Sequence, residues 1–262
     1  MNPIKKLILF FFLSTASLSF FSAHAEVETA FWQTTKSQHF VIYSQEVPKG
    51  FVQRLISHAE SYYNRIIDSL GFRRFDFWTW DNRAKIYLFK DSSSYQNETE
   101  RDGWSGGMVH VGSRTIKTFV GQSGFFDSML PHEMAHIIFR EFIGEDKRLP
   151  LWIDEGVACS QEESMLDTRI EMAKSMIENS SYIDFDAFSK IGDSLSVDPQ
   201  VFYSQAASII AFLIERNGRD RFFDFSRRVR DGEDWTVALC KAYRFSDLKD
   251  MEEKWKRFMS QQ

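Results

Sequence analysis

The first half of the chain alternates short apolar runs with one longer stretch of helical spacing. Residues 39–44 (HFVIYS) and 84–90 (AKIYLFK) are rich in β-branched and aromatic side chains, which predicts two strands. Between them, apolar and aromatic residues recur every three to four positions across residues 50–70, and Gly71 follows. This pattern predicts a helix that ends at the glycine. The residues at this spacing are Phe51, Leu55, His58, Tyr62 and Ile66.

The pattern changes after residue 123. Before it, GWSGGMVHVGSRTIKTFVG predicts a hairpin with strands at 108–111 and 115–120, joined by Gly112-Ser113-Arg114. After it, every periodic segment has helical spacing. The sequence therefore predicts an α+β fold in one domain, residues 26–262. An α/β lobe with a small mixed or antiparallel sheet and a helix would occupy 26–122, and a mostly helical lobe 123–262. A functional site is expected between them.

The N-terminal segment has the features of a cleavable secretory signal. Lys5 and Lys6 precede an apolar run that is interrupted by serine and threonine residues, and the segment ends in Ala23-His24-Ala25. This order of charge, apolar run and small residues predicts a signal peptide over 1–25, cut after Ala25. The expected location is secreted or periplasmic. An uncleaved anchor is the alternative reading of the same segment.

Composition narrows the classes of partner. The chain carries 32 Lys and Arg against 37 Asp and Glu, a formal charge of −5, and the predicted signal contains two of the lysines and no acid. A mature chain this acidic is a poor ligand for phosphate backbones, so no nucleic-acid partner is expected. No second apolar stretch approaches the roughly 20 residues of a membrane span, so no membrane association is expected after cleavage.

The two cysteines leave two possibilities open. Cys159 and Cys240 are the only ones in the chain, and both lie in segments predicted to be helical. An exported chain meets oxidising conditions, which would allow them to pair. The other reading is two buried thiols, because sequence does not give the Cα–Cα distance that a disulfide requires.

The segment PHEMAH, residues 131–136, carries the clearest chemical signal. Asp127 or Ser128 is expected to cap a helix running to about Phe142, with Gly144 after it. On such a helix His132 and His136 differ by about 40° in rotation and about 6 Å in rise, so both imidazoles point the same way. Neutral imidazole nitrogens are good zinc ligands. Glu133, turned about 100° away, is placed to accept a proton from a water molecule activated by the metal.

A third ligand is needed, and no histidine occurs after His136. The metzincin pattern requires glycine and histidine where this chain has Phe139 and Phe142, which excludes that class. The chain continues instead into RLPLWIDEGVACSQE, with Pro150 at a predicted helix start and Glu155 within the helix. The intervening residues 137–154 allow the first helix to end and the second to return antiparallel to it.

These motifs together resemble a known family, the glutamate-zincin branch of metallopeptidases. This peptidase MA-like group includes thermolysin and the zinc aminopeptidases. The matching pieces are HEMAH, LPLWIDEG with its WxxEG core, YSQAASIIAFL and DLKDMEEKWKRFM, in the same order over residues 131–259. The resemblance implies a zincin-like fold with one zinc ion per chain, held by His132, His136 and Glu155. It also implies that Glu133 is the general base.

The same resemblance suggests a donor for the oxyanion. Thermolysin-like enzymes can use a downstream histidine, which this chain lacks, and the downstream tyrosines are Tyr182, Tyr203 and Tyr243. Tyr203 opens the segment that resembles the helix behind the site, and its phenol can donate a hydrogen bond. The competing interpretation is a tyrosine packed at a helix start with its hydroxyl in water.

The predicted hairpin bears on the type of peptidase. In the resembled fold an edge strand pairs with the extended backbone of the substrate. Zinc aminopeptidases carry a GAMEN-type sequence there, whose glutamate binds a free N-terminus, whereas this chain has GGMVH with Val109 and no acid. The expected activity is therefore hydrolysis of internal bonds in a peptide or protein substrate. The alternative function is a non-catalytic exported zinc-binding module; the oligomeric state is left open.

Two residues next to the third ligand have competing interpretations. Asp154 could orient a ligand histidine from behind, or be a solvated acid at a helix start. Trp152 is expected to be a core anchor under the second helix rather than a substrate contact.

Overall fold

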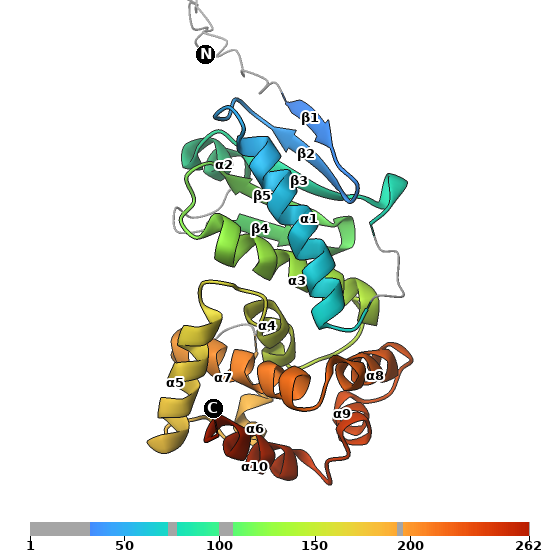
Figure 1. Ribbon diagram of the computed structural model, residues 1–262, viewed down its shortest axis with the longest axis vertical. Coiled ribbons are helices and arrows are strands. Elements are labelled where there is room, and N and C mark those ends of the chain that lie inside the picture. The colour runs from blue at the N-terminus through green and yellow to red at the C-terminus, as the bar shows by residue number, and fades with distance from the viewer. Residues whose placement is uncertain (1–31, 73–77, 100–106, 193–195, 262) are drawn as a thin grey trace, which may run out of the picture. The chain divides into compact units, whose positions relative to one another are not determined.

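A five-stranded mixed sheet forms the N-terminal part of the computed structural model (Figure 1). Its spatial order is β1 (Gln33–Lys36), β2 (Phe40–Ser44), β3 (Ala84–Phe89), β5 (Thr115–Phe119) and β4 (Gly107–His110). The two central pairings, β2 with β3 and β3 with β5, are parallel, and both outer pairings are antiparallel. The predicted strands and the hairpin are confirmed, with the first hairpin strand ending one residue earlier because Val111–Ser113 forms a 3-10 turn.

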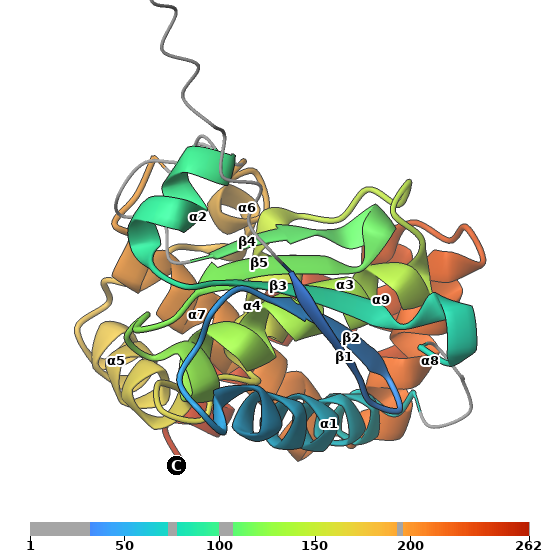
Figure 2. The ribbon, with the colours of Figure 1, turned by 90° about the horizontal axis from the view of Figure 1, so that it is seen from above.

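Helix α1 (Phe51–Ser69) lies across the sheet and packs against β2 and α3 (Figures 1 and 2). The predicted helix is confirmed, but His58 is exposed and Ala59 takes the buried position. The short helix α2 (Ser92–Thr99) packs through Tyr95 against the end of the sheet.

Helix α3 (Leu130–Ile143) carries the HEMAH segment, and Pro131 lies in its first turn. The expected cap is wrong. A wider π-helical turn, Phe125–Met129, runs directly into α3, so Asp127 and Ser128 lie inside helical backbone and neither caps it. This turn begins after Gly124, whose φ of 66° is one that glycine adopts without strain. Gly144 ends α3 as expected.

The rest of the chain is helical, and among the described residues no strand follows β5. The helices are α4 (Leu151–Cys159), α5 (Leu166–Glu178), α6 (Phe185–Phe188), α7 (Pro199–Ala211), α8 (Arg219–Arg230), α9 (Trp235–Tyr243) and α10 (Leu248–Met259). A π-helical turn, Phe212–Arg216, extends α7. The predicted α+β, zincin-like fold is confirmed. Trp152 is fully buried, as expected of a core anchor.

Helix α4 packs closely against α7, and Gly156 is the reason that it can. A Cβ atom at Gly156 would lie 2.6 Å from the carbonyl oxygen of Ala206 and 2.7 Å from a side-chain carbon of Ile210. No ordinary side chain fits within that separation. The glycine of the WxxEG segment thus lets the two backbones meet one residue after Glu155.

The structure describes residues 32–72, 78–99, 107–192 and 196–261. The predicted signal peptide, residues 1–25, lies outside this part of the chain. Within it, none of the helices combines the length and the apolar character needed to cross a membrane.

Candidate metal centre

Three side chains from two helices converge on one point. His132 and His136 lie one turn apart on α3, and their Nε2 atoms are 3.1 Å from each other. Oε2 of Glu155, from α4, lies 3.6 Å from the first Nε2 and 3.7 Å from the second. A set of two imidazole nitrogens and one carboxylate oxygen at these separations can close around a single metal ion with little movement.

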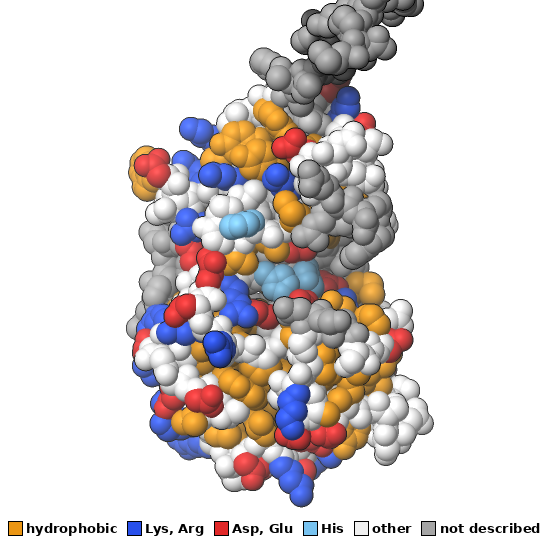
Figure 3. All heavy atoms as spheres, turned by 180° about the vertical axis from the view of Figure 1, so that it is seen from behind, with side chains coloured by type: hydrophobic (Ala, Val, Ile, Leu, Met, Phe, Trp, Pro, Cys, Tyr) orange, Lys and Arg blue, Asp and Glu red, His pale blue; other side chains and the backbone are white. Residues whose placement is uncertain are grey.

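The convergence point is reachable from solvent although its surroundings are buried. The side chains of His132, His136 and Glu155 are 18%, 14% and 19% exposed. Their neighbours on the two helices belong to the core, including Met134, Ile137 and Ile153. In Figure 3, histidine and acidic side chains meet on this face of the molecule. A metal held there would keep a position open for water or substrate, which is what a catalytic site requires.

The negative charges of the Glu155 and Glu133 carboxylates are only partly balanced by positive charges nearby. Burial, opposed by the charge of His132 and assisted by the negative charges of Asp154, Glu133 and Glu162, raises the pKa of Glu155 to about 7. Burial also raises the pKa of Glu133. The pKa of His136 is far below its usual value because of burial and the charges of His132 and Arg140. Neutral imidazole and crowded carboxylates together are the donor set that a divalent cation stabilises.

A carboxylate that sequence reasoning missed fixes the first ligand. Oε1 of Glu162 lies 2.8 Å from Nδ1 of His132. Burial raises the pKa of Glu162, but hydrogen bonds from His132 and Arg169 outweigh it and leave the pKa below its usual value. An ionised carboxylate can only accept, so the proton must be on Nδ1 of the imidazole. In the neutral form of this imidazole, Nε2 then carries the lone pair that a metal binds, as in carboxylate–histidine–metal triads.

Glu162 is itself anchored from two directions. Arg169, on α5, donates to both carboxylate oxygens at 3.1 and 2.9 Å, and the Ser128 hydroxyl donates at 3.3 Å. The Arg169 guanidinium also lies over the ring of Tyr203, 5.6 Å from its centroid. Helices α3, α5 and α7 are thus linked through one buried charge network.

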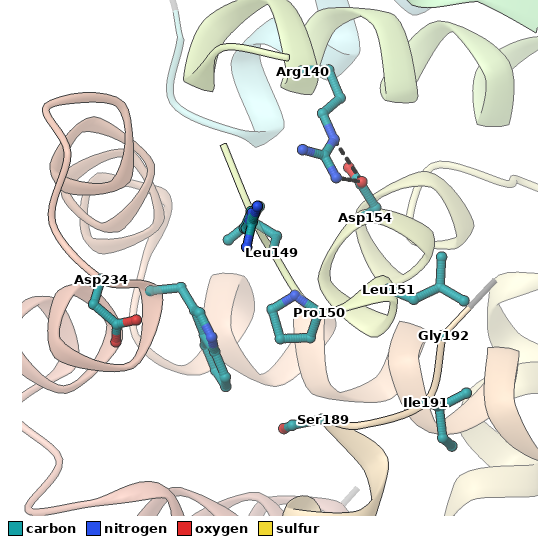
Figure 4. Close-up of a pocket in the computed structure, with 11 residues that line it drawn as sticks. Arg140, Leu149, Pro150, Leu151, Asp154, Ser189, Ile191, Gly192 and Asp234 are labelled. Atoms are coloured by element: carbon teal, nitrogen blue, oxygen red, sulfur yellow. Dashed lines mark hydrogen bonds and ion pairs between the residues drawn. The ribbon is translucent and has the colours of Figure 1, made fainter. Parts of the chain in front are cut away.

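Neither interpretation of Asp154 is correct. Its side chain is 12% exposed, so it is not solvated, and it contacts Arg140 of α3 instead of a histidine. Figure 4 shows the Arg140 guanidinium reaching from α3 to this carboxylate. Glu155 faces the histidines while Asp154, turned about 100° on the same helix, faces the next turn of α3. Asp154 therefore holds the two helices together.

Tyr203 lies near the ligands, whereas the other two downstream tyrosines do not. Burial raises its pKa to about 12, and the charges of Glu155, Cys159 and Glu162 contribute in the same direction. By contrast, the Tyr182 hydroxyl contacts Lys256, and Tyr243 is buried near Arg221. The phenol of Tyr203 is thus protonated at neutral pH and can act as a donor.

The comparison with known families agrees with this geometry. The family model of the peptidase MA superfamily matches residues 80–261. The chain belongs to the peptidase MA superfamily. A comparison with curated proteins found no significant match. Members of the peptidase MA superfamily are generally zinc-dependent, and the three converging side chains are a fitting donor set for that ion.

Both cysteines of this peptidase MA domain are free. Cys159 is buried at the end of α4 with its sulfur 3.9 Å from Nδ1 of His132, and Cys240 lies in α9. The disulfide interpretation is therefore wrong, and the buried-thiol interpretation is correct for Cys159 but not for Cys240, which is only half-buried.

The different surroundings of Glu155 and Asp154 predict that alanine at 155 lowers mainly the zinc affinity, whereas alanine at 154 lowers mainly the stability. Glu155→Ala should weaken zinc affinity more than 100-fold because a direct ligand is lost, and Asp154→Ala less than tenfold. Asp154→Ala should instead lower the free energy of unfolding by about 3 kcal/mol, because Arg140 is left buried without its partner. Chelator competition and urea titration measure the two quantities.

A matched double variant serves as the control. Arg140→Met combined with Asp154→Leu should recover much of the lost stability, because both charges are removed together. Equal losses of zinc affinity in the two single variants would mean that Glu155 is not a ligand.

Proposed function

We propose that this chain is an exported zinc-dependent metallopeptidase that cleaves internal bonds of peptide or protein substrates. The observation that carries the proposal is the convergence of His132, His136 and Glu155 on one accessible point of an otherwise buried helix pair. Export is proposed from the residue pattern of segment 1–25.

The groups around that point would each have a separate role in hydrolysis. Bound zinc would polarise the scissile carbonyl and lower the pKa of water. Glu133, whose pKa is raised by burial, would accept the proton of the attacking water and then deliver it to the leaving amine. Tyr203 would donate a hydrogen bond to the carbonyl oxygen as negative charge develops there.

The edge strand β4 supplies a binding surface for an extended substrate. It is the last strand of the sheet order and pairs only with β5 among the described residues. Its far edge carries backbone donors and acceptors that an extended peptide can pair with. His110, at the end of β4, is exposed, and its Nδ1 accepts a hydrogen bond from the Ser113 amide. This bond favours a structural role for His110.

A direct test uses the mature chain loaded with one equivalent of zinc. A broad library of internally varied peptides is incubated with the zinc-loaded and the chelator-stripped protein, and products are mapped by mass spectrometry. Internal cleavage that requires the metal is the expected result. Zinc binding without cleavage of any peptide would contradict peptidase activity and favour a non-catalytic binding module.

The role of Tyr203 makes a separate prediction. Tyr203→Phe should keep fold and zinc content but lower kcat by about 10- to 1,000-fold with little change in KM, because the donor acts mainly on the charged transition state. Steady-state kinetics on one good peptide measures this. Tyr182→Phe, whose hydroxyl contacts Lys256 far from the ligands, is the control. An unchanged kcat in Tyr203→Phe would remove this residue from the mechanism.

A further inference from the structure

A second feature of the surface lies beside the metal centre and is not used by the proposed chemistry. It is a pocket of about 470 Å³ where the start of α4 meets the segment after α6 and the start of α9 (Figure 4). The side chains of Leu149, Leu151, Ile191 and Trp235 form the apolar part of its wall, and polar side chains form the rest. Arg140 and Asp154 line it on the side of the metal centre.

The position of the pocket is set by the helix that bears the histidines. Arg140 lies one turn beyond His136 on the same face of α3, about 6 Å along the axis, and Asp154 directly precedes Glu155. The pocket thus begins one helical turn from the metal ligands. An extended peptide advances about 3.3 Å per residue, so its second to fourth residue from the scissile bond would reach the pocket.

Strand β4 runs alongside α3 in the same direction. At its start, a Cβ on Gly107 would lie 2.7 Å from the Met129 sulfur, just before α3. Just after its end, Nε of Arg114 donates to Glu141 near the end of α3 at 2.8 Å. The pocket therefore lies toward the C-terminal end of β4. A substrate paired antiparallel to β4, the more stable pairing, would place residues N-terminal to the scissile bond there.

The charges around the pocket are not equally available. Arg140 is fully engaged, since Nε and Nη2 donate to Asp154 and Nη1 donates to the carbonyl of Lys147 at 2.8 Å. Asp234 caps α9, where its Oδ1 accepts from the amides of Thr236 and Val237.

Arg148 is the cation of the pocket that stays open to a ligand, whereas the carboxylate of Asp154 keeps one oxygen, Oδ1, buried without a hydrogen-bond partner among the described residues. It is exposed at the pocket rim, and among the described residues it makes no ion pair or hydrogen bond. A further polar group, the Ser189 hydroxyl, lies buried on the pocket wall with no partner in the described part of the chain. Apolar side chains on part of the wall and an open cation at the rim match a side chain with a short apolar stem and an anionic end.

We propose that this pocket is a specificity subsite for an acidic side chain, Glu or Asp, located two to four residues N-terminal to the scissile bond. The Arg148 guanidinium pairs with the substrate carboxylate, and the apolar walls hold its stem. This inference rests on the proposed peptidase function, because it assigns the residue preference of that same cleft.

Binding to an inactive variant tests the proposal apart from turnover. Fluorescence anisotropy measures how tightly zinc-loaded Glu133→Gln protein binds labelled peptides. The peptides carry either Glu or Gln at one position, two to four residues N-terminal to the bond that the active protein cleaves. The Glu peptide is expected to bind about 3- to 10-fold more tightly, as a partly exposed ion pair allows, with a smaller ratio at high salt. Adding Arg148→Gln should reduce the ratio to about one, and Arg148→Glu should reverse the preference toward a Lys peptide.

A neighbouring cation provides the matched control. Lys147 lies one residue away, does not line the pocket and pairs with Asp146 at 3.7 Å. Lys147→Gln in the same background should leave the Glu-to-Gln ratio unchanged. If it lowers the ratio as much as Arg148→Gln does, the preference reflects general surface charge and the subsite is refuted.

The outcomes separate this inference from the function on which it rests. Zinc-dependent cleavage of peptides without an acidic preference would overturn the subsite and leave the peptidase intact. A preference confined to residues C-terminal to the scissile bond would overturn the proposed placement. Failure to cleave any peptide would refute the peptidase, whereas a Glu preference in the anisotropy assay that depends on Arg148 would still support the pocket as an acid-binding site.

Discussion

Glu133→Gln is expected to lower kcat by at least about a hundredfold while the zinc content stays at one equivalent. General-base assistance is worth about 10²–10⁴ in rate, and glutamine cannot accept the proton of the attacking water. The side chain keeps its size, so the packing of α3 should not change. Glu133 directly follows His132 on α3, and burial, the largest influence on the pKa of both His132 and Glu155, is accompanied by a smaller raising effect of the Glu133 charge on each. Single-turnover kinetics together with elemental analysis measures both quantities.

A glutamate outside the cluster provides the control for Glu133. Glu145 is exposed just after α3. Glu145→Gln removes the same charge and should keep the activity of the parent protein. Wild-type rates in Glu133→Gln would show that another group accepts the proton.

His136→Ala is expected to abolish zinc binding, and all metal-dependent activity with it. Its Nε2 lies within 4 Å of both other candidate ligand atoms, so its loss leaves two donors where a zinc site needs at least three. Elemental analysis after dialysis against trace zinc should give less than about a tenth of an equivalent.

An exposed histidine on α1 provides the control for His136→Ala, because it tests whether removing any histidine lowers the zinc content. His58→Ala should retain one equivalent of zinc, because His58 lies on the exposed side of that helix. Full zinc occupancy in His136→Ala would mean that the metal is held elsewhere, for example by the second group of His132, Cys159 and Glu162.

Elements with strong periodicity could be predicted from sequence, and polar ones could not. Strands β2 and β3 and helix α1 have clear apolar patterns, and all three were predictable. Strand β1 is QTTK, which has no apolar alternation, and it forms only because the edge of β2 is available to it. Helix α2 buries a single residue, Tyr95, so its pattern was too weak to recognise.

The candidate ligands were predictable for a geometric reason. The spacing of His132 and His136 fixes their relative direction on any helix, and the motif order indicated Glu155. Glu162 could not be found this way, because α4 ends at Cys159 and an irregular turn carries the chain to residue 162. Its contact with His132 depends on that turn. Asp154 was misjudged because its partner, Arg140, depends on how α3 and α4 cross.

The close approach at Gly156 limits how this site could be re-engineered. The residue lies between Glu155 on its own helix and the backbone of α7, the helix that carries Tyr203. Any larger side chain at 156 would force the two helices apart, and the distance between Glu155 and Tyr203 would grow with them. By contrast, Arg148 lies on a connecting segment outside this contact. Laboratory selection for new substrates can therefore vary the pocket rim freely, while position 156 should accept no other amino acid.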